Sequence, residues 1–391
     1  MKQKIVVFSQ RVLLIFSYYF FKCFMFKPST KFNWTVGVDD ICGLSINIAK
    51  ILDAHSVSFY HDQSIGNRFY NYRLNDSKFK VLNLFIFGPL ILGYLMNTSQ
   101  GFFYISDSRF LFTRYDQGEF ELHFLKAKNK KIVQWFCGSD IRSVVLSKSI
   151  QLKSDYETFA DVIPLISPYV LTDEYDFKKK LIARVTDRYA DLIFTNEIDQ
   201  ISYLMSPALN TSPIIGEEYF SFNPDKFTFS AGKKIQVVHV ASNVFIKGTP
   251  LVMSAVNRLK KEGFDFDFHL LTAAPKSEVI AKLQEAHIVL GQFYSRTSGH
   301  SGAEALANTT IVLQSVSKNN MNFVIEPWVE TYSYEVYENL KKVLINISEY
   351  IDVAVSGYDF ATANFHIFSV AKELKSQLKK LERIQIKNPT R

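Results

Sequence analysis

The chain has 391 residues, of which 47% are hydrophobic, and a formal net charge of +7. This length predicts two domains of roughly 150–200 residues each, and the hydrophobic content excludes a wholly disordered chain. The three cysteines, Cys23, Cys42 and Cys137, have neither the spacing of a disulfide framework nor that of a zinc site, which indicates a reducing compartment.

Positive charge is concentrated at the two ends of the chain. Residues 1–38 hold six Lys or Arg and no acidic residue, and residues 371–391 hold seven Lys or Arg and two acidic residues, so the body between them is net negative. A nucleic-acid-binding protein carries its basic stripe on the folded body, so no nucleic-acid partner is expected. Basic ends fit a protein that meets an anionic membrane surface.

The first predicted element is an apolar helix over residues 5–25. On a helix, Lys4, Arg11, Tyr18 and Lys22 share one face, and the rest of the surface is almost wholly apolar. We expect residues 1–31 to be a membrane-contact segment that lies flat, with its cations at the headgroups and its apolar side in the acyl boundary. Two alternatives stay open: an element buried in the first domain, or a spanning helix that carries charges into the bilayer.

Residues 32–215 have the pattern of a first α/β domain. A strand, a helix and a second strand follow one another at the start, which favours a parallel sheet. The predicted strands are residues 32–38, 57–60, 101–105, 131–137 and 191–195, and the first helix is residues 44–54. The segment 210–226, which contains Pro213 and Pro224, is the candidate linker.

Residues 216–345 alternate regularly between strand and helix patterns, which predicts a doubly wound parallel sheet. The predicted strands are residues 235–240, 266–271, 288–292 and 310–314, and the predicted helices are residues 249–262, 276–286 and 301–308. Amphipathic helices are expected at 334–347 and 371–384, and residues 346–391 are expected to cross back to the first domain. That return would bring the basic C-terminus near the basic N-terminus.

Two loops of the second domain follow strands at the edge where open α/β sheets bind ligands. The first carries Lys247 and Gly248, and the second carries Gly299, His300, Ser301 and Gly302 before a helix that begins near Glu304. A lysine, free amides at a helix start and one carboxylate suit a nucleoside diphosphate and its ribose. The alternatives are a solvated lysine and a carboxylate that only complements the helix dipole.

These segments resemble the donor-binding half of GT-B glycosyltransferases, especially the family-4-like retaining enzymes. The resemblance implies two Rossmann-like domains that face a cleft, with a C-terminal crossover helix. It implies that Asn243, Lys247, Gly248, Gly299, His300, Ser301 and Gly302 bind the donor, that the Lys247 ammonium neutralises the leaving phosphate, and that Glu304 accepts hydrogen bonds from the ribose hydroxyls.

In the first domain, residues 138–142 (G-S-D-I-R) resemble the family segment that faces the cleft, although Cys137 stands where the family usually has His. Asp140 and Arg142 are therefore candidates to orient the acceptor or sugar hydroxyls. The alternative for Asp140 is a structural cap of the turn that follows the strand.

Two further positions depart from the family pattern. Arg296 stands where the first glutamate of the family's paired glutamates is expected, and Val244 stands where relatives carry an arginine. Arg296 is a candidate to supply the positive charge at the phosphate that the arginine absent at position 244 would otherwise supply. No Asp-x-Asp motif is present, and we expect no metal and no cofactor besides the nucleotide-sugar substrate.

The leading hypothesis is a retaining glycosyltransferase that moves a sugar from a nucleotide sugar to a lipid-linked or polysaccharide-precursor acceptor. It would work in the cytoplasm, peripheral to the inner face of the cell membrane. The alternative from another class, which Arg296 and Val244 motivate, is a non-catalytic GT-B-like protein that binds a nucleotide sugar or partner transferases. A weaker third is a nucleotide-sugar epimerase or hydrolase.

Overall fold

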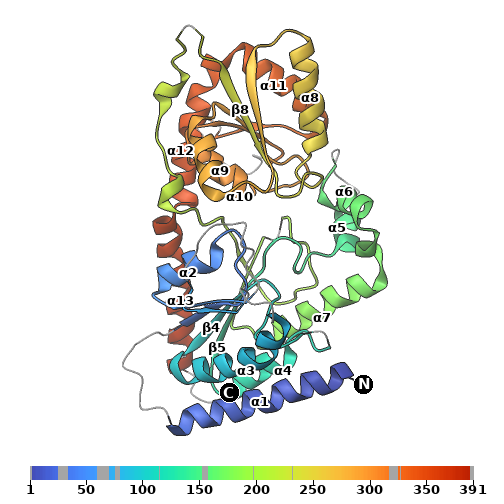
Figure 1. Cartoon of the computed structure of the whole chain (residues 1–391), viewed down its shortest axis with the longest axis vertical. Helices are drawn as coiled ribbons and strands as arrows, with labels where there is room; N and C mark the ends of the chain where they lie inside the picture. Colours follow the sequence, from blue (N-terminus) through green and yellow to red (C-terminus); the bar gives the residue numbers. More distant parts are fainter. Residues whose placement is uncertain are drawn as a thin grey trace.

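Two parallel α/β domains follow one another along the long axis of the molecule in the computed structural model (Figure 1). The structure describes residues 2–24, 34–59, 70–74, 80–113, 115–151, 157–196, 198–230, 232–316, 325 and 327–387. Three predicted elements lie partly outside these residues. They are the strand 32–38 at its first two residues, the strand 57–60 at its last residue, and the segment 1–31 at residues 1 and 25–31.

The described part of the first domain contains a seven-stranded parallel sheet in the order β3-β2-β1-β4-β5-β6-β7. Its strands are β1 (Trp34–Gly37), β2 (His55–Ser58), β3 (Tyr72–Arg73), β4 (Gly101–Ile105), β5 (Lys131–Trp135), β6 (Leu192–Thr195) and β7 (Leu209–Asn210). Its helices are α1 (Lys2–Phe24), α2 (Leu44–Leu52), α3 (Lys80–Thr98), α4 (Glu119–Ala127), α5 (Val144–Gln151), α6 (Phe159–Ile166), η2 (Pro168–Leu171) and α7 (Asp173–Tyr189).

The second domain has a five-stranded parallel sheet in its described residues, in the order β12-β11-β10-β8-β9. Its strands are β8 (Ile235–Val240), β9 (Phe266–Leu271), β10 (Ile288–Leu290), β11 (Ile311–Gln314) and β12 (Val329–Glu330). Its helices are η3 (Glu217–Tyr219), η4 (Pro224–Phe227), α8 (Thr249–Lys261), α9 (Lys276–Glu285), α10 (His300–Leu306), η5 (Ser333–Glu335), α11 (Val336–Ile345), η6 (Ile347–Tyr350) and α12 (Ile351–Asn364), and α13 (Ile367–Lys387) closes the chain.

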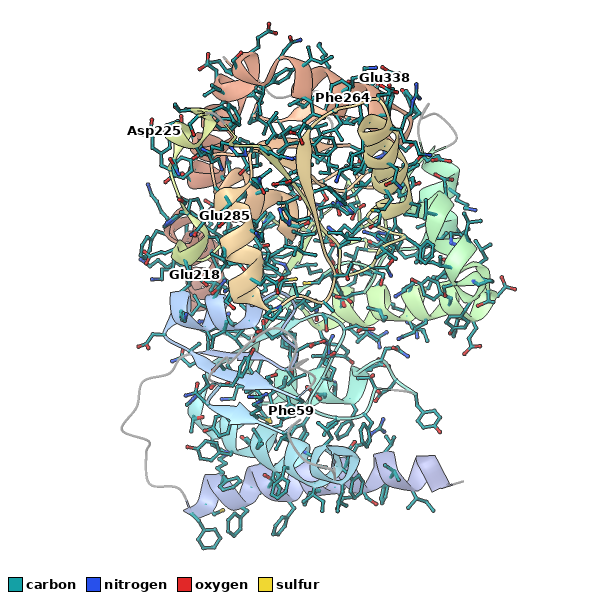
Figure 2. All side chains as sticks on the ribbon, turned by 45° about the horizontal axis from the view of Figure 1, so that its top comes forward. Phe59, Glu218, Asp225, Phe264, Glu285 and Glu338 are labelled. Atoms are coloured by element: carbon teal, nitrogen blue, oxygen red, sulfur yellow. The ribbon has the colours of Figure 1, made fainter. Side chains whose placement is uncertain are left out.

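Strand residues alternate between two cores in each domain, as side chains of a sheet covered on both faces must. In β4, Phe102 packs with α3 and α4, whereas Phe103 packs with α2 and α13. In β8, Val237 packs with α8 and α11, whereas Val238 packs with α9, α10 and α12. Figure 2 shows side chains filling both domains, with Phe59 in the interior of the first. The predicted arrangement of two doubly wound parallel domains is confirmed.

The N-terminal helix is oriented differently from the prediction. Helix α1 packs along α3, and its polar residues Gln10 and Ser17 point inward, where their side chains donate to carbonyl oxygens of α3. Arg11 pairs with Asp116 at 2.6 Å and lies over the ring of Phe120, so its cation is used inside the protein and is not presented to headgroups. The predicted stripe through Arg11 and Tyr18 therefore faces the first domain, and the apolar side of the helix faces outward.

The return to the first domain occurs later than residue 346. Helix α12 still belongs to the second domain, because Ala361 is buried in the core between α9 and α10. The chain crosses at Phe365–Ile367, and α13 then packs against α2 with Leu374 and Leu378 buried in the first domain. The predicted crossover helix is present, but it is α13 alone.

Candidate functional site

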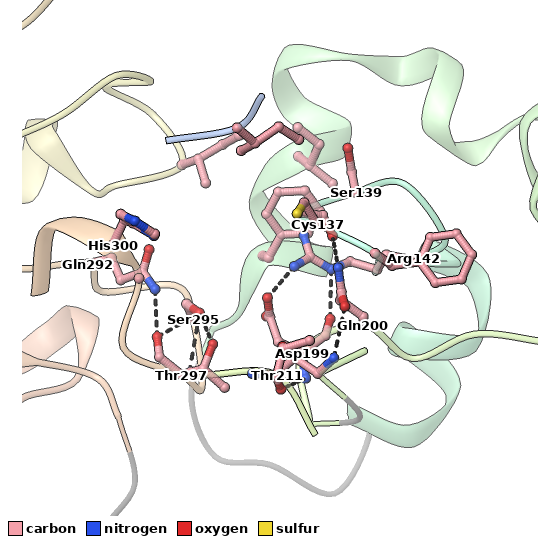
Figure 3. A pocket seen from close by; sticks show the side chains of 18 of the residues that line it. Cys137, Ser139, Arg142, Asp199, Gln200, Thr211, Gln292, Ser295, Thr297 and His300 are labelled. Carbon is pink, nitrogen blue, oxygen red and sulfur yellow. Dashed lines mark hydrogen bonds and ion pairs between the residues drawn. The ribbon is translucent and has the colours of Figure 1, made fainter. Parts of the chain in front are cut away.

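A cavity of about 620 Å³ lies between the two domains at the carboxyl ends of both sheets. The first domain contributes the segments after β1, β5 and β6 together with α6 and η2, and the second contributes the loops after β8 and β10. Figure 3 shows Arg142, Asp199 and Gln200 on one wall, with Gln292, Thr297 and His300 on the other. Because parallel strands end at a common edge, residues distant in sequence meet here.

Lys247 lies directly behind the second-domain wall, where it contacts Gln292, a residue that lines the cavity. Its ammonium donates to the amide oxygen of Gln292 at 2.9 Å and to the hydroxyl of Ser301 at 3.2 Å. Burial of the group lowers its pKa, an effect that the nearby Cys42 and Glu304 oppose. Gly248, the residue just before α8, has a φ of +76°, a backbone conformation that favours glycine.

Two glycines of the second loop, Gly299 and Gly302, lie so close to polar side chains that a larger residue would not fit. A Cβ on Gly299 would lie 2.8 Å from the Gln292 amide oxygen and 2.9 Å from the Lys247 ammonium nitrogen. A Cβ on Gly302 would lie 2.5 Å from the amide oxygen of Gln314. The structure therefore brings Lys247, Gly299, Ser301 and Gly302 together, as the sequence predicts for a diphosphate site.

Glu304 lines a second cavity, of about 560 Å³, next to the first. Its other walls come from the start of α9, including Pro275 and Ser277, and from α2 of the first domain. Cys42 and His300 line both cavities, so the two cavities are neighbours that share these residues in their walls. Glu304 and Gln292, the partner of Lys247, therefore lie on adjacent spaces.

The first-domain wall holds its polar groups in internal contacts. Arg142 forms an ion pair with Asp199, donates to the Asp199 carbonyl oxygen at 2.7 Å and lies over the ring of Phe159 at 4.0 Å. A carboxylate oxygen of Asp140 accepts from the backbone N–H of Cys137 at 2.7 Å, which matches the alternative of a turn cap. Burial raises the pKa of Asp140 to about 7, helped by the charge of Asp107.

Asn243 and Arg296, both predicted to contact the donor, lie in the loops around the cavity but are not among the residues that line it. The side-chain oxygen of Asn243 accepts from the backbone N–H groups of Phe245 and Ile246, so Asn243 shapes the turn before Lys247. Arg296 is half-buried between Ser295 and Thr297, which line the cavity. The proposal that Arg296 supplies a phosphate cation stays a prediction. Within the described ranges no three His, Cys, Asp or Glu side chains gather as metal ligands do, and metal independence also stays a prediction.

Sequence reasoning missed Gln292 and the apolar wall of α6 and η2. Gln292 accepts from Lys247 and donates from its amide nitrogen to the carbonyl oxygen of Thr297 at 2.6 Å, so it links the two loops. Its position just after β10, at the ligand-binding edge of the sheet, is the signal that could have revealed it. The wall of α6 had no such signal, because its contact with the cavity is made only in the folded chain.

No protein-family model matches the chain, and no curated protein matches its sequence. Solved structures do match in fold. HepE from Anabaena, solved with UDP and glucose, is 11% identical over 88% of this chain and 98% of its own, with a TM-score of 0.56. Sucrose-phosphate synthase from Thermosynechococcus elongatus is 12% identical over 92% of this chain and 97% of its own, with a TM-score of 0.58. The chain therefore has the GT-B fold of the glycosyltransferases.

Proposed function

We propose that this protein is a retaining glycosyltransferase that uses a nucleotide sugar as donor. The observation that carries the proposal is the pair of neighbouring cavities, with Gln292, the hydrogen-bond partner of Lys247, on one and Glu304 on the other. The ribose would hydrogen-bond to Glu304, the diphosphate would lie by Lys247 and Ser301, and the sugar would enter the larger cavity. HepE, which has a similar fold, was solved with UDP and glucose, and this supports a nucleotide sugar as the donor.

In the transfer step, the bond between the anomeric carbon and the phosphate oxygen breaks while the acceptor oxygen bonds to the same carbon. Negative charge grows on the departing diphosphate, and the Lys247 ammonium stabilises it most in the transition state. The proton of the acceptor hydroxyl goes to an oxygen of the departing diphosphate. The products are the glycosylated acceptor and the nucleoside diphosphate, so atoms and charge balance.

The first-domain wall supports retention of configuration. An inverting transfer needs a base opposite the leaving group to take the acceptor proton. Of the described residues that line the larger cavity, Asp199 is the one with a carboxylate, and its oxygen is held in an ion pair with Arg142. The imidazole of His300 lines the second-domain wall, on the side of the proposed diphosphate site. A front-side transfer in which the leaving phosphate takes the proton needs no such protein group.

We further propose that the acceptor is lipid-linked or a polysaccharide precursor, reached at the cytoplasmic face of the membrane. The outward side of α1 supports this. Its large apolar side chains are exposed, among them Phe8 at 68%, Phe16 at 62% and Phe24 at 70%, and Figure 2 shows aromatic rings extending from α1 away from the molecule. Helices that lie in the membrane interface present an exposed apolar face of this kind. Residues 5–24 are also long and apolar enough to span a bilayer, but their inner face is packed on α3.

The test is a panel of nucleotide sugars, each incubated with the full chain and with anionic vesicles that carry a bacterial lipid extract. Acceptor-dependent release of nucleoside diphosphate, with the sugar recovered in the lipid, supports transfer. Release that does not need the extract would instead indicate a hydrolase. Binding without release would indicate the non-catalytic alternative.

A further inference from the structure

Residues 159–171, which form α6 and η2, are an apolar segment on the surface beside the larger cavity. Their sequence, F-A-D-V-I-P-L-I-S-P-Y-V-L, has Asp161 and Ser167 as its main polar side chains. Helices that are apolar on every side are normally buried. Here, however, Leu165 is 81% exposed, and Tyr169 and Leu171 are 47% and 48% exposed. Figure 1 shows α6 rising from the first domain beside the second.

This segment has an inner side and an outer side, and both are apolar. On the inner side, Phe159, Ile163 and Val170 line the cavity. On the outer side, Leu165, Ile166 and Leu171 face solvent. Apolar side chains therefore extend from the cavity wall to the outside of the molecule. Asp161 is the charged side chain within the described segment 159–171, and the Arg142 guanidinium, which is paired with Asp199, lies over the Phe159 ring at the inner end.

We propose that this segment, called here the α6–η2 ramp (residues 159–171), holds the hydrocarbon chain of the acceptor. The inference rests on the proposed glycosyl transfer and narrows its acceptor to a lipid-linked hydroxyl compound. The hydroxyl end would reach the donor sugar beside Lys247, and the chain would leave the cavity along Phe159 and Ile163. A polysaccharide acceptor without a lipid would leave this apolar surface unused.

The charges around the ramp favour a single hydrocarbon chain over the surface of an anionic bilayer. Helix α7 begins directly after the ramp with Asp173 and Glu174, both exposed. Carboxylates beside an anionic membrane are repelled by it, whereas they do not affect contact with an uncharged chain. The surface proposed to contact the bilayer itself is the outward apolar face of α1.

The experiment titrates the full chain with hexyl, heptyl and octyl β-glucosides, below their micelle-forming concentrations, by calorimetry. A hydrocarbon site strengthens binding by roughly two- to fourfold for each added methylene group. Leu165→Asp and Leu171→Asp, at exposed positions where folding tolerates a charge, should remove this dependence on chain length. Ile345→Asp, an exposed aliphatic position of the second domain, should keep it, and so should Phe8→Ser on α1.

Several results would overturn the proposed hydrocarbon site on the α6–η2 ramp. Equal binding of the three glucosides, or Leu165→Asp that behaves like Ile345→Asp, overturns the ramp. So does a wild-type chain that sediments as a dimer and becomes monomeric in Leu165→Asp, because the surface is then an interface between two copies. The titration contains no donor, so failure of the proposed transfer would not affect it. Transfer to lipid and lipid-free acceptors at equal rates would overturn the ramp while leaving the proposed function intact.

Discussion

The ammonium of Lys247 and the amide oxygen of Gln292 lie 2.9 Å apart, although 45 residues separate them in the sequence. The orientation of the Gln292 amide is set by its nitrogen, which donates to the Thr297 carbonyl oxygen at 2.6 Å. Lys247 is thus held in place by the neighbouring loop before any ligand arrives. A preorganised cation is worth more to a transition state than one that must be ordered during the reaction.

Gln292→Leu should therefore lower kcat while the affinity for the nucleoside diphosphate changes little. A hydrogen bond to a charged group contributes about 1.5–3 kcal/mol, so we expect turnover to fall by roughly one to two orders of magnitude. Steady-state kinetics with the donor that the panel identifies measures this. Gln236→Leu, at a partly exposed position of β8, is the control. Equal losses in the two variants would show that Gln292 does not position Lys247.

Lys247→Ala should reduce turnover more than donor affinity, because the charge on the leaving diphosphate is largest in the transition state. We expect a fall in kcat/KM that comes mainly from kcat. The control is Lys261→Ala, an exposed lysine at the end of α8. If Lys247→Ala changes only KM, the lysine contributes to binding and has no special part in the transfer.

Glu304→Ala should weaken nucleotide binding, with the loss set by two ribose hydrogen bonds to a charged acceptor, each worth roughly 1.5–3 kcal/mol before compensation. Calorimetric titration with nucleoside diphosphates measures the dissociation constants. Glu338→Ala on the exposed surface of α11 should bind as the wild type does. If the Glu304→Ala protein keeps wild-type affinity, the ribose does not bind at Glu304 in the second cavity.

The double substitution Phe8→Ser and Phe16→Ser should release the protein from anionic vesicles. Burying an aromatic side chain contributes about 1.5–3 kcal/mol, so the partition coefficient should fall by at least about tenfold, and high salt should not reproduce the whole effect. Vesicle sedimentation measures it, with Phe222→Ser and Phe368→Ser, two comparably exposed positions, as control. Deleting α1 is a poorer test, because Leu14 and Tyr18 belong to the first-domain core.

His239 should make folding stability depend on pH below neutrality. Its ring is buried, its two nitrogens contact the Leu290 carbonyl and the Thr249 hydroxyl, and burial lowers its pKa from 6.5 to about 4. The unfolded chain gains this proton at higher pH than the folded protein does. The contribution is therefore present above pH 6.5 and lost as pH falls through about 4, by up to about 3 kcal/mol.

Urea denaturation of wild type and His239→Gln across pH 4 to 7 measures that difference. The gap between the two midpoints should narrow as the pH falls, and the exposed His123→Gln serves as a control that leaves the buried ring intact. A gap that stays constant over this range would mean that folding does not shift the pKa of His239.

The sequence predicted most of the second domain because its strands and helices alternate with clear hydrophobic periods. It also indicated the loops of Lys247 and Glu304, since both follow strands at one sheet edge. It could not predict which side of α1 faces the protein. Helical spacing groups Arg11 with Tyr18, but the choice of face depends on Asp116 and on the carbonyls of α3, about 75 to 105 residues away.

The placement of Asp140 was also undecided by sequence. A carboxylate after a strand can cap the turn or face a ligand, and only the position of the Cys137 N–H, 2.7 Å away, favours the cap. The paired side chains Arg142 and Asp199, 57 residues apart, could not be matched in advance for the same reason. Long-range polar contacts have no periodic pattern in the chain.

The two crossings between the domains lie side by side. The backbone N–H of Ile215 donates to the Phe365 carbonyl at 2.8 Å, and that of Ile367 donates to the Ile215 carbonyl at 3.1 Å. Because these bonds tie the two segments together, neither can slide along the other without breaking them. The two domains are therefore connected through one paired segment of backbone, although the chain passes between them at two places far apart in the sequence.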